Sequence, residues 1–244
     1  MRAAQTGMKP PLPKRFYKEA GVEERNGRYF LILDGRTART PNRQELAVSS
    51  RGLAEALAAE WAAQGAEINP ATMPVTRIVN SAIDGVAPRR AEVVDDLVRY
   101  AGSDLTYYRA GEPERLARAQ DEAWNPILDW ARDTHGARFS LAEGVMHVAQ
   151  PDEAVAAIRH AVEEIASPFA LAALHVMTTL TGSILIALAH ASRAIDADEA
   201  WAAAHVDEHH QESLWGEDHE AMERRRKREA DFRAASEVFR LAGR

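Results

Sequence analysis

The residues with the clearest capacity for chemistry lie in one short stretch, His205-Val-Asp-Glu-His-His-Gln-Glu. His205 and His209 are four residues apart, so on a helix both imidazoles could reach one ion. Asp207 and His210 form a D-x-x-H pair, in which a carboxylate and an imidazole share one helix face. Since these groups are common ligands of zinc and iron, one hypothesis is a metal-dependent helical enzyme that uses the cluster from His205 to Glu212.

The cluster departs from established metal motifs in two respects. A zinc peptidase of the H-E-x-x-H type needs Glu directly after its first His, and Val206 stands there in this chain. A di-iron bundle needs matching carboxylates on other helices, and only the stretches 94–96 and 163–164 offer them. The competing hypothesis is therefore a polar helix whose side chains face solvent or a protein partner.

Other catalytic motifs are absent from the sequence. It contains no G-x-x-x-x-G-K-[ST] loop, no G-x-G-x-x-G after a strand and no G-x-S-x-G elbow. Thr181-Gly182-Ser183 resembles part of a phosphate loop, but it lies in the middle of an expected helix. The backbone N–H groups there are engaged within the helix and are not free to bind an anion. Glycine at this position is better suited to the close approach of a neighbouring helix.

The elements that must position these residues belong to a globular protein of ordinary composition. The chain has 244 residues, of which 46% are hydrophobic and 27% charged, enough for one large domain or two modest ones. A net charge of −7 argues against nucleic acid as a partner. Without cysteine there are no disulfides and no thiolate chemistry, which fits a reducing compartment. The N-terminus lacks the apolar core of a secretory signal, so we expect a cytoplasmic protein.

The longest apolar stretch, Ser167 to Ser192, contains no Asp, Glu, Lys or Arg. Ser167 followed by Pro168 is a favourable helix start, and a helix that is apolar on every side must be buried. Its length is close to that of a membrane span. However, its Thr, Ser and His residues, and the lack of a second such stretch, favour burial in protein. We therefore predict one long central helix around which the other elements pack.

The remaining pattern predicts an α+β fold. Asn26-Gly27 and Asp34-Gly35 separate short apolar runs from Phe16 to Thr40, which predicts an antiparallel β-meander with Leu46–Val48 as a further short strand. Apolar residues at helical spacing then dominate the chain. The expected architecture is a small N-terminal β-rich domain with one or two helices, residues 1–88, followed by a larger all-helical domain, residues 89–244.

Element boundaries within the helical part can also be predicted. Asn125-Pro126 should kink or restart the helix that begins near Pro113. Residues 138–141 and 145–148 alternate weakly and could form two short strands. Asp196, with Glu199 three residues later, resembles a capping box, and a helix is expected to run from there to Trp215.

Five spaced signatures occur in order along the chain: Glu60-Trp61-x-x-Gln64; Ile68-x-Pro70-x-x-Met73-Pro74-x-Thr76; Gln120-x-x-x-Trp124-x-Pro126; Thr181-Gly182-Ser183; and Asp207-Glu208-x-x-Gln211-x-x-x-Trp215-Gly216. Together they resemble the Atp12-type assembly chaperones of ATP synthase, which bind the free α subunit of the F1-ATPase. The similarity extends from about Phe16 to Phe239. It departs at His209 and His210, where eukaryotic members are more acidic and aromatic.

This resemblance implies an N-terminal β-rich domain, a C-terminal helical domain, no catalysis and no cofactor. It also implies a partner, the unassembled α subunit, whose subunit interface would be shielded until the β subunit replaces the chaperone. We expect a monomer in the bacterial cytoplasm, whereas eukaryotic relatives act in the mitochondrial matrix. A structural subunit of a stable complex is a further alternative.

The contact surface is expected on the helix that ends at Trp215. Glu208, Gln211 and Trp215 recur at three and four residues, so they share one face, with Asp207 and Glu217 beside it. A tryptophan with acidic neighbours suits an anchor surrounded by a charged rim. The alternative is that Trp215 caps the helical core and the acidic side chains are solvated.

Overall fold

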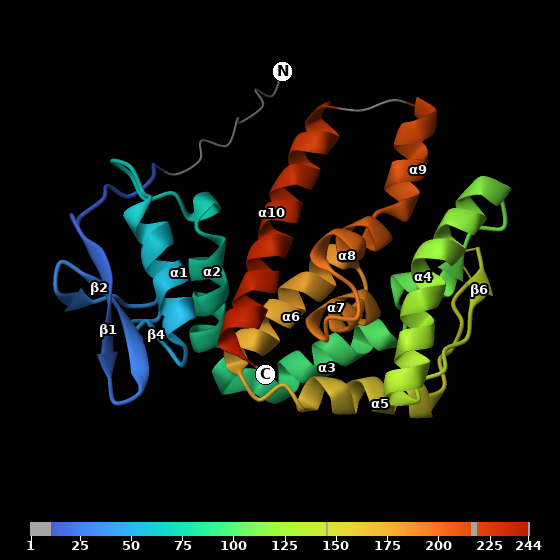
Figure 1. Ribbon diagram of the computed structural model, residues 1–244, viewed down its shortest axis with the longest axis horizontal. Coiled ribbons are helices and arrows are strands. Elements are labelled where there is room, and N and C mark those ends of the chain that lie inside the picture. Colours follow the sequence, from blue (N-terminus) through green and yellow to red (C-terminus); the bar gives the residue numbers. More distant parts are fainter. Residues whose placement is uncertain (1–10, 145, 216–218, 244) are drawn as a thin grey trace, which may run out of the picture.

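The computed structural model describes residues 11–144, 146–215 and 219–243 (Figure 1). The N-terminal part is the predicted antiparallel meander. Its strands are β1 (Ala20–Arg25), β2 (Arg28–Leu33), β3 (Arg36–Thr37) and β4 (Ala47–Val48). β2 is central, because it pairs with β1 on one side and with β3 and β4 on the other. Both tight turns have positive φ at the predicted Asn-Gly and Asp-Gly pairs, with φ of 52° at Asn26 and 46° at Asp34.

Helices form most of the rest of the molecule, and the first of them packs against the sheet. In the described part of the chain they are α1 (Arg51–Ala62), α2 (Pro74–Ser81), α3 (Arg90–Ala101), α4 (Glu114–His135), α5 (Asp152–Glu163), α6 (Pro168–Thr181), α7 (Ile184–Ala191), α8 (Ala197–Ala204), α9 (Val206–Trp215) and α10 (His219–Ala242). A π-helical turn, Ala82–Val86, extends α2. The fold is therefore α+β, as predicted.

One hydrophobic core runs from the sheet into the helices. Leu31 of β2 and Leu53 and Leu57 of α1 are fully buried in the same cluster as Leu174 of α6 and Phe232 of α10. α10 packs against α6, α2 and α1, and Figure 1 shows it passing between the N-terminal part and the remaining helices. The division into domains at residue 88 stays a prediction.

The predicted single helix from Ser167 to Ser192 is wrong, because the chain breaks at Gly182. Ser167 caps α6 as expected, by accepting a hydrogen bond from the Ala170 N–H. Gly182 then adopts the left-handed conformation with φ of 68°. Ser183 starts α7 by accepting a hydrogen bond from the Ile186 N–H at 3.0 Å. None of the described helices has the length and apolar character needed to cross a membrane.

The break is held by Asp104, a fully buried carboxylate in the loop after α3. Asp104 accepts hydrogen bonds from Ser183 Oγ at 2.6 Å and from the Leu185 N–H at 3.2 Å. It also accepts from the N–H and the hydroxyl of Thr106, at 3.0 and 2.9 Å. Thr181-Gly182-Ser183 therefore does not lie within one helix, contrary to the prediction. At the start of α7 Asp104 accepts from the Ser183 hydroxyl and the Leu185 N–H, while the Ser183 N–H donates to Thr181 Oγ1 at 3.3 Å.

Two other boundary predictions need correction, and a third needs it in part. α4 continues through Pro126, so the predicted restart is wrong and the predicted kink stays a prediction. The helix expected from Asp196 to Trp215 has the predicted capping box, yet it is divided at His205 into α8 and α9. The two strands expected at 138–148 are not formed in the described residues, and Val145 lies outside them. A two-residue strand, β6 (Ala142–Glu143), instead pairs in parallel with β5 (Tyr108–Arg109).

Gly182→Ala is expected to lower the free energy of unfolding by about 1–2 kcal/mol, because an L-residue pays this cost in the left-handed conformation. A Cβ at this position would meet no atom within 4 Å, so the cost is conformational. Gly65→Ala is the matched control, since a Cβ there is equally free of contacts and the backbone is not left-handed. Urea unfolding of both variants would test the assignment, and an equal effect of the two substitutions would contradict it.

Candidate functional site

The predicted contact helix, α9, begins at a sharp break around His205. The His205 side chain is 2% exposed and its ring lies 3.9 Å from the Trp201 ring, centroid to centroid. Nδ1 lies 2.8 Å from the Trp201 carbonyl oxygen, which can only accept, so Nδ1 carries the hydrogen. Burial lowers the pKa of His205, although the Trp201 hydrogen bond and the Glu208 charge oppose this shift. His205 therefore acts as a buried packing residue at the junction of α8 and α9.

The metal hypothesis finds no geometric support in the described part of the chain. His205 is turned into the core, whereas His209 is exposed. Across residues 11–144, 146–215 and 219–243, no three His, Asp or Glu side chains are arranged so that they could hold a metal ion. The cluster from His205 to Glu212 is instead divided among contacts with α4, contacts with α10 and solvent.

One side of α9 is fastened to α4 through two residues of the third sequence signature. Gln120 Nε2 donates a hydrogen bond to Asp207 Oδ1 at 2.7 Å, while Gln120 Oε1 accepts one from the Ala110 N–H at 2.7 Å. Trp124, which is 1% exposed, donates from Nε1 to the Ala203 carbonyl oxygen at 2.7 Å. These residues thus fix where α8 and α9 lie relative to α4, and Asp207 takes part in this junction.

α9 is also tied to α10. Glu212 accepts a hydrogen bond from Arg225 Nη1 at 2.9 Å, and both side chains are partly buried. The hydrogen bond from Arg225 lowers the pKa of Glu212. α9 is therefore held from two directions, as Figure 1 shows for its position between α4 and α10.

The residues of the first two signatures are structural as well. Glu60 of α1 accepts hydrogen bonds from the N–H groups of Val75 and Thr76, both at 2.7 Å, and so caps the start of α2. Burial raises the pKa of Glu60, and these hydrogen bonds oppose the shift. Gln64 accepts from the Asn69 N–H at 2.8 Å. Trp61 is partly buried against Tyr17, with ring centroids 5.4 Å apart.

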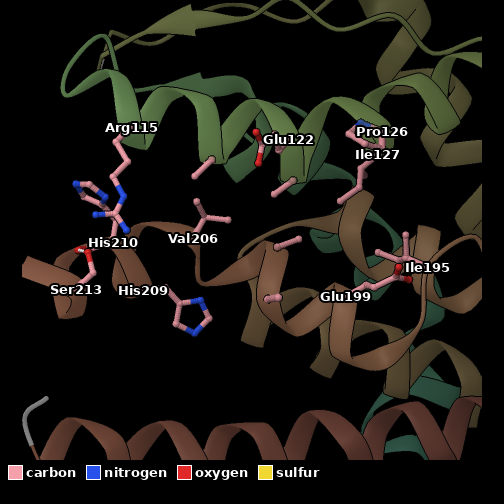
Figure 2. A pocket seen from close by; sticks show the side chains of 14 residues that line it. Arg115, Glu122, Pro126, Ile127, Ile195, Glu199, Val206, His209, His210 and Ser213 are labelled. Atoms are coloured by element: carbon pink, nitrogen blue, oxygen red, sulfur yellow. Dashed lines mark hydrogen bonds between the residues drawn. The ribbon is translucent and has the colours of Figure 1, made fainter.

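A groove of about 570 Å³ opens between α4 and the α8–α9 pair (Figure 2). Most of its lining side chains are small or apolar, with polar groups at the rim. The lining residues are Arg115, Ala119, Glu122, Ala123, Pro126, Ile127, Ile195, Glu199, Ala202, Ala203, Val206, His209, His210 and Ser213.

The predicted contact residues lie elsewhere on α9. Glu208 and Gln211 are exposed, and neither lines the groove. The Glu208 carboxylate lies 3.6 Å from His205 Nε2. Trp215 is the final residue of α9, but its side chain lies outside the described structure, as does Glu217. The structure thus leaves Glu208 and Gln211 available to a partner and assigns Asp207 to the contact with α4.

Sequence reasoning missed the groove because its two walls are separated by about 80 residues of chain. One signal was present: Ala119, Ala123 and Ile127 recur every four residues along α4. This spacing places small apolar side chains in a row, but it does not reveal whether the row is covered. α8 and α9 contact α4 through Gln120 and Trp124, which lie beside this row, and so the row of small side chains stays uncovered.

The chain is similar in sequence to known proteins. The sequence profile described as ATP12 chaperone protein matches residues 14–132. The protein named atp12, mitochondrial, of Schizosaccharomyces pombe is 24% identical over 229 residues, covering 87% of this chain and 78% of the relative.

Solved structures are more similar still. The Atu1473 protein of Agrobacterium tumefaciens is 49% identical, with a TM-score of 0.92, covering 98% of this chain and 90% of that one. Atp12 of Paracoccus denitrificans is 38% identical, with a TM-score of 0.88, covering 95% of this chain and 99% of that one. Because its sequence and fold are similar to those of Atp12 over nearly the full length of both chains, the chain belongs to the ATP12 chaperone family.

Proposed function

We propose that this protein is an assembly chaperone for the F1 sector of ATP synthase that binds the unassembled α subunit. It shields the subunit interface of α until the β subunit replaces it. The observation that carries the proposal is the likeness to Atp12 of Paracoccus denitrificans, which spans 95% of this chain. Membership of the ATP12 chaperone family supports the role in ATP synthase assembly, and the choice of the α subunit is the finer step proposed here.

The physical basis is the exposure of interfaces before assembly. A subunit of a ring ATPase carries large apolar surfaces that its neighbours cover in the finished complex, and these surfaces can self-associate while they are free. A protein that covers one of them, and is displaced by the proper neighbour, needs no bond-making chemistry. The structure suits such a role, because α9 presents a polar face on a helix that α4 and α10 hold in place.

We place the contact with the α subunit on the face of α9 that carries Glu208 and Gln211, with Asp207 beside it and, from the sequence alone, with Trp215 and Glu217. Glu208 and Gln211 are exposed on a firmly anchored helix, so binding requires little reordering. The same proposal includes a monomer that acts in the bacterial cytoplasm. A mass measurement by light scattering would test the oligomeric state.

Glu208→Lys is expected to abolish capture of the free α subunit while leaving the free energy of unfolding within about 0.5 kcal/mol of the original. The Glu208 side chain is 48% exposed and lies beside His205 at the base of α9. The measurement is a pull-down of purified α subunit, with thermal unfolding of each variant alongside.

Glu23→Lys is the matched control, because the Glu23 side chain is 50% exposed and also lies beside a basic residue, Arg25. Equal capture of α by the two variants would remove the placement on α9. Failure of the unsubstituted chain to capture α would remove the proposed function itself. Co-purification with mature ATP synthase at fixed stoichiometry would instead favour a structural subunit.

A further inference from the structure

The groove between α4 and the α8–α9 pair is a surface that the contact face of α9 does not include. Its floor consists of short side chains, with Ala123 and Ala119 on α4 facing Ala202 and Val206 across the gap. Short side chains on both walls leave room for longer apolar side chains from another element. A volume of about 570 Å³ accommodates several such side chains.

The walls determine which kind of element can enter. Helices form both walls, and their backbone N–H and C=O groups are hydrogen-bonded within each helix. The groove therefore offers no strand edge with which an extended peptide could pair. A helix satisfies its own backbone groups, so it can bury an apolar stripe here without leaving buried polar groups unpaired.

Charged side chains of opposite sign lie at different positions along the rim of the groove. Figure 2 shows Arg115 and His210 together at one end and Glu199 with Ile195 at the other, with Glu122 on the α4 rim between them. Arg115 and Glu122 form no ion pair with any side chain in the described part of the chain. His210 Nε2 is buried, so Arg115 supplies the exposed charge at that end. A complementary helix carries an acidic group toward Arg115 and a basic group toward Glu122 and Glu199.

We propose that this groove receives an amphipathic helix of the client protein, with its apolar stripe against Ala119, Ala123 and Ala202 and its charged residues in the stated order. The inference rests on the proposed function, since the client is the unassembled α subunit. It adds a second contact, of a different kind, on the side of α9 away from Glu208. If the client contacts both the groove and the face that carries Glu208, then α9 lies between two segments of the client.

The absence of cysteine allows a direct test in the full chain. Ala202→Cys introduces a single thiol on an exposed position of α8 at the groove, and Ala59→Cys introduces one on an exposed position of α1 as the control. Each thiol is labelled with an environment-sensitive fluorophore, and purified α subunit is then added. We expect a blue shift and loss of quenching by iodide at position 202 only. A photoreactive label at position 202 should crosslink to a helical segment of α with apolar residues three and four apart.

A blocking substitution supplies the second measurement. Ala202→Trp fills the groove from a solvent-facing position and should weaken capture of α at least about tenfold, whereas Ala59→Trp should leave capture unchanged. Capture of α with an unaltered label at position 202, or undiminished capture by Ala202→Trp, would overturn the groove proposal and leave the proposed function standing. A crosslink to a strand of α, or a small apolar molecule found in the groove of purified protein, would overturn the helical occupant. Absence of any capture by the unsubstituted chain would remove both proposals.

Discussion

Replacing Asp104 by leucine is expected to lower the free energy of unfolding by roughly 3–5 kcal/mol. Leucine has the same branching as aspartate, but it is larger and has no acceptor, so the N–H groups of Thr106 and Leu185 lose their buried partner. Each unsatisfied buried donor costs about 1–3 kcal/mol, and Ser183 loses its hydrogen bond as well. The measurement is urea unfolding at neutral pH, followed by circular dichroism.

The Asp104→Asn variant separates hydrogen bonding from charge. Its amide oxygen still accepts, so its loss of stability should be well below that of the leucine variant. Burial raises the folded-state pKa of Asp104, despite the hydrogen bonds that oppose the shift. An acid with a raised pKa favours folding when protonated, and this contribution is lost as the pH rises through the folded-state pKa. The original chain should therefore gain stability relative to Asp104→Asn as the pH falls from 7. A leucine variant as stable as the original would show that the break at Gly182 needs no carboxylate.

Trp124→Ala is the second substitution with a large expected effect, again roughly 3–5 kcal/mol. Trp124 is almost fully buried, its N–H joins α4 to the Ala203 carbonyl, and the Arg109 guanidinium lies 5.1 Å from its ring centroid. Removing the ring leaves a cavity, an unpaired carbonyl and an Arg109 without its aromatic contact. Because this junction positions α8 and α9, capture of the α subunit should fall with stability.

Trp130→Ala in the same helix is the control for Trp124. Trp130 is only partly buried, so its removal should cost markedly less. Trp124→Phe, which keeps most of the apolar ring but loses the N–H, should fall between the two, at about 1–2 kcal/mol. Thermal unfolding of the three variants would rank them, and equal losses at positions 124 and 130 would contradict the assigned role of the junction.

The sequence was sufficient to predict tight turns and helix starts, because neighbouring residues determine them. Asn26-Gly27 and Asp34-Gly35 adopt the positive φ angles that tight hairpin turns need, so the meander follows from two dipeptides. Ser167 with Pro168, and Asp196 with Glu199, begin helices by hydrogen bonds within four residues. These signals hold because the partner groups are neighbours in the chain.

The sequence-based predictions failed or were incomplete where the local structure depends on a residue that is distant in the chain. The helix break at Gly182 is held by Asp104, which is 79 residues from Ser183 in the chain. Gly182 followed by Ser183 is a local signal of a helix end and a helix start, but the apolar residues on both sides favoured one continuous helix. The contact of Asp207 with Gln120 spans 87 residues, so its part in joining α9 to α4 could not be predicted from the sequence, and its partner-binding role stays a prediction. At Pro126 the predicted restart does not occur: Pro lacks an N–H, yet α4 is continuous there, with Trp124 and Ile127 buried on either side. Tertiary context overrides local propensity at such positions.

The packing of α10 has a consequence for synthesis of the chain. α10 covers α6 and α2, although both precede it by many residues, and its buried contacts extend to Phe239. The ribosome must therefore translate at least the first 239 residues before these apolar faces can be covered. Until then the nascent polypeptide exposes apolar surface of the kind that an assembly chaperone covers on its client proteins. Only after that point can the molecule exist in its binding-competent form, so its own maturation sets the earliest moment at which it can receive a client.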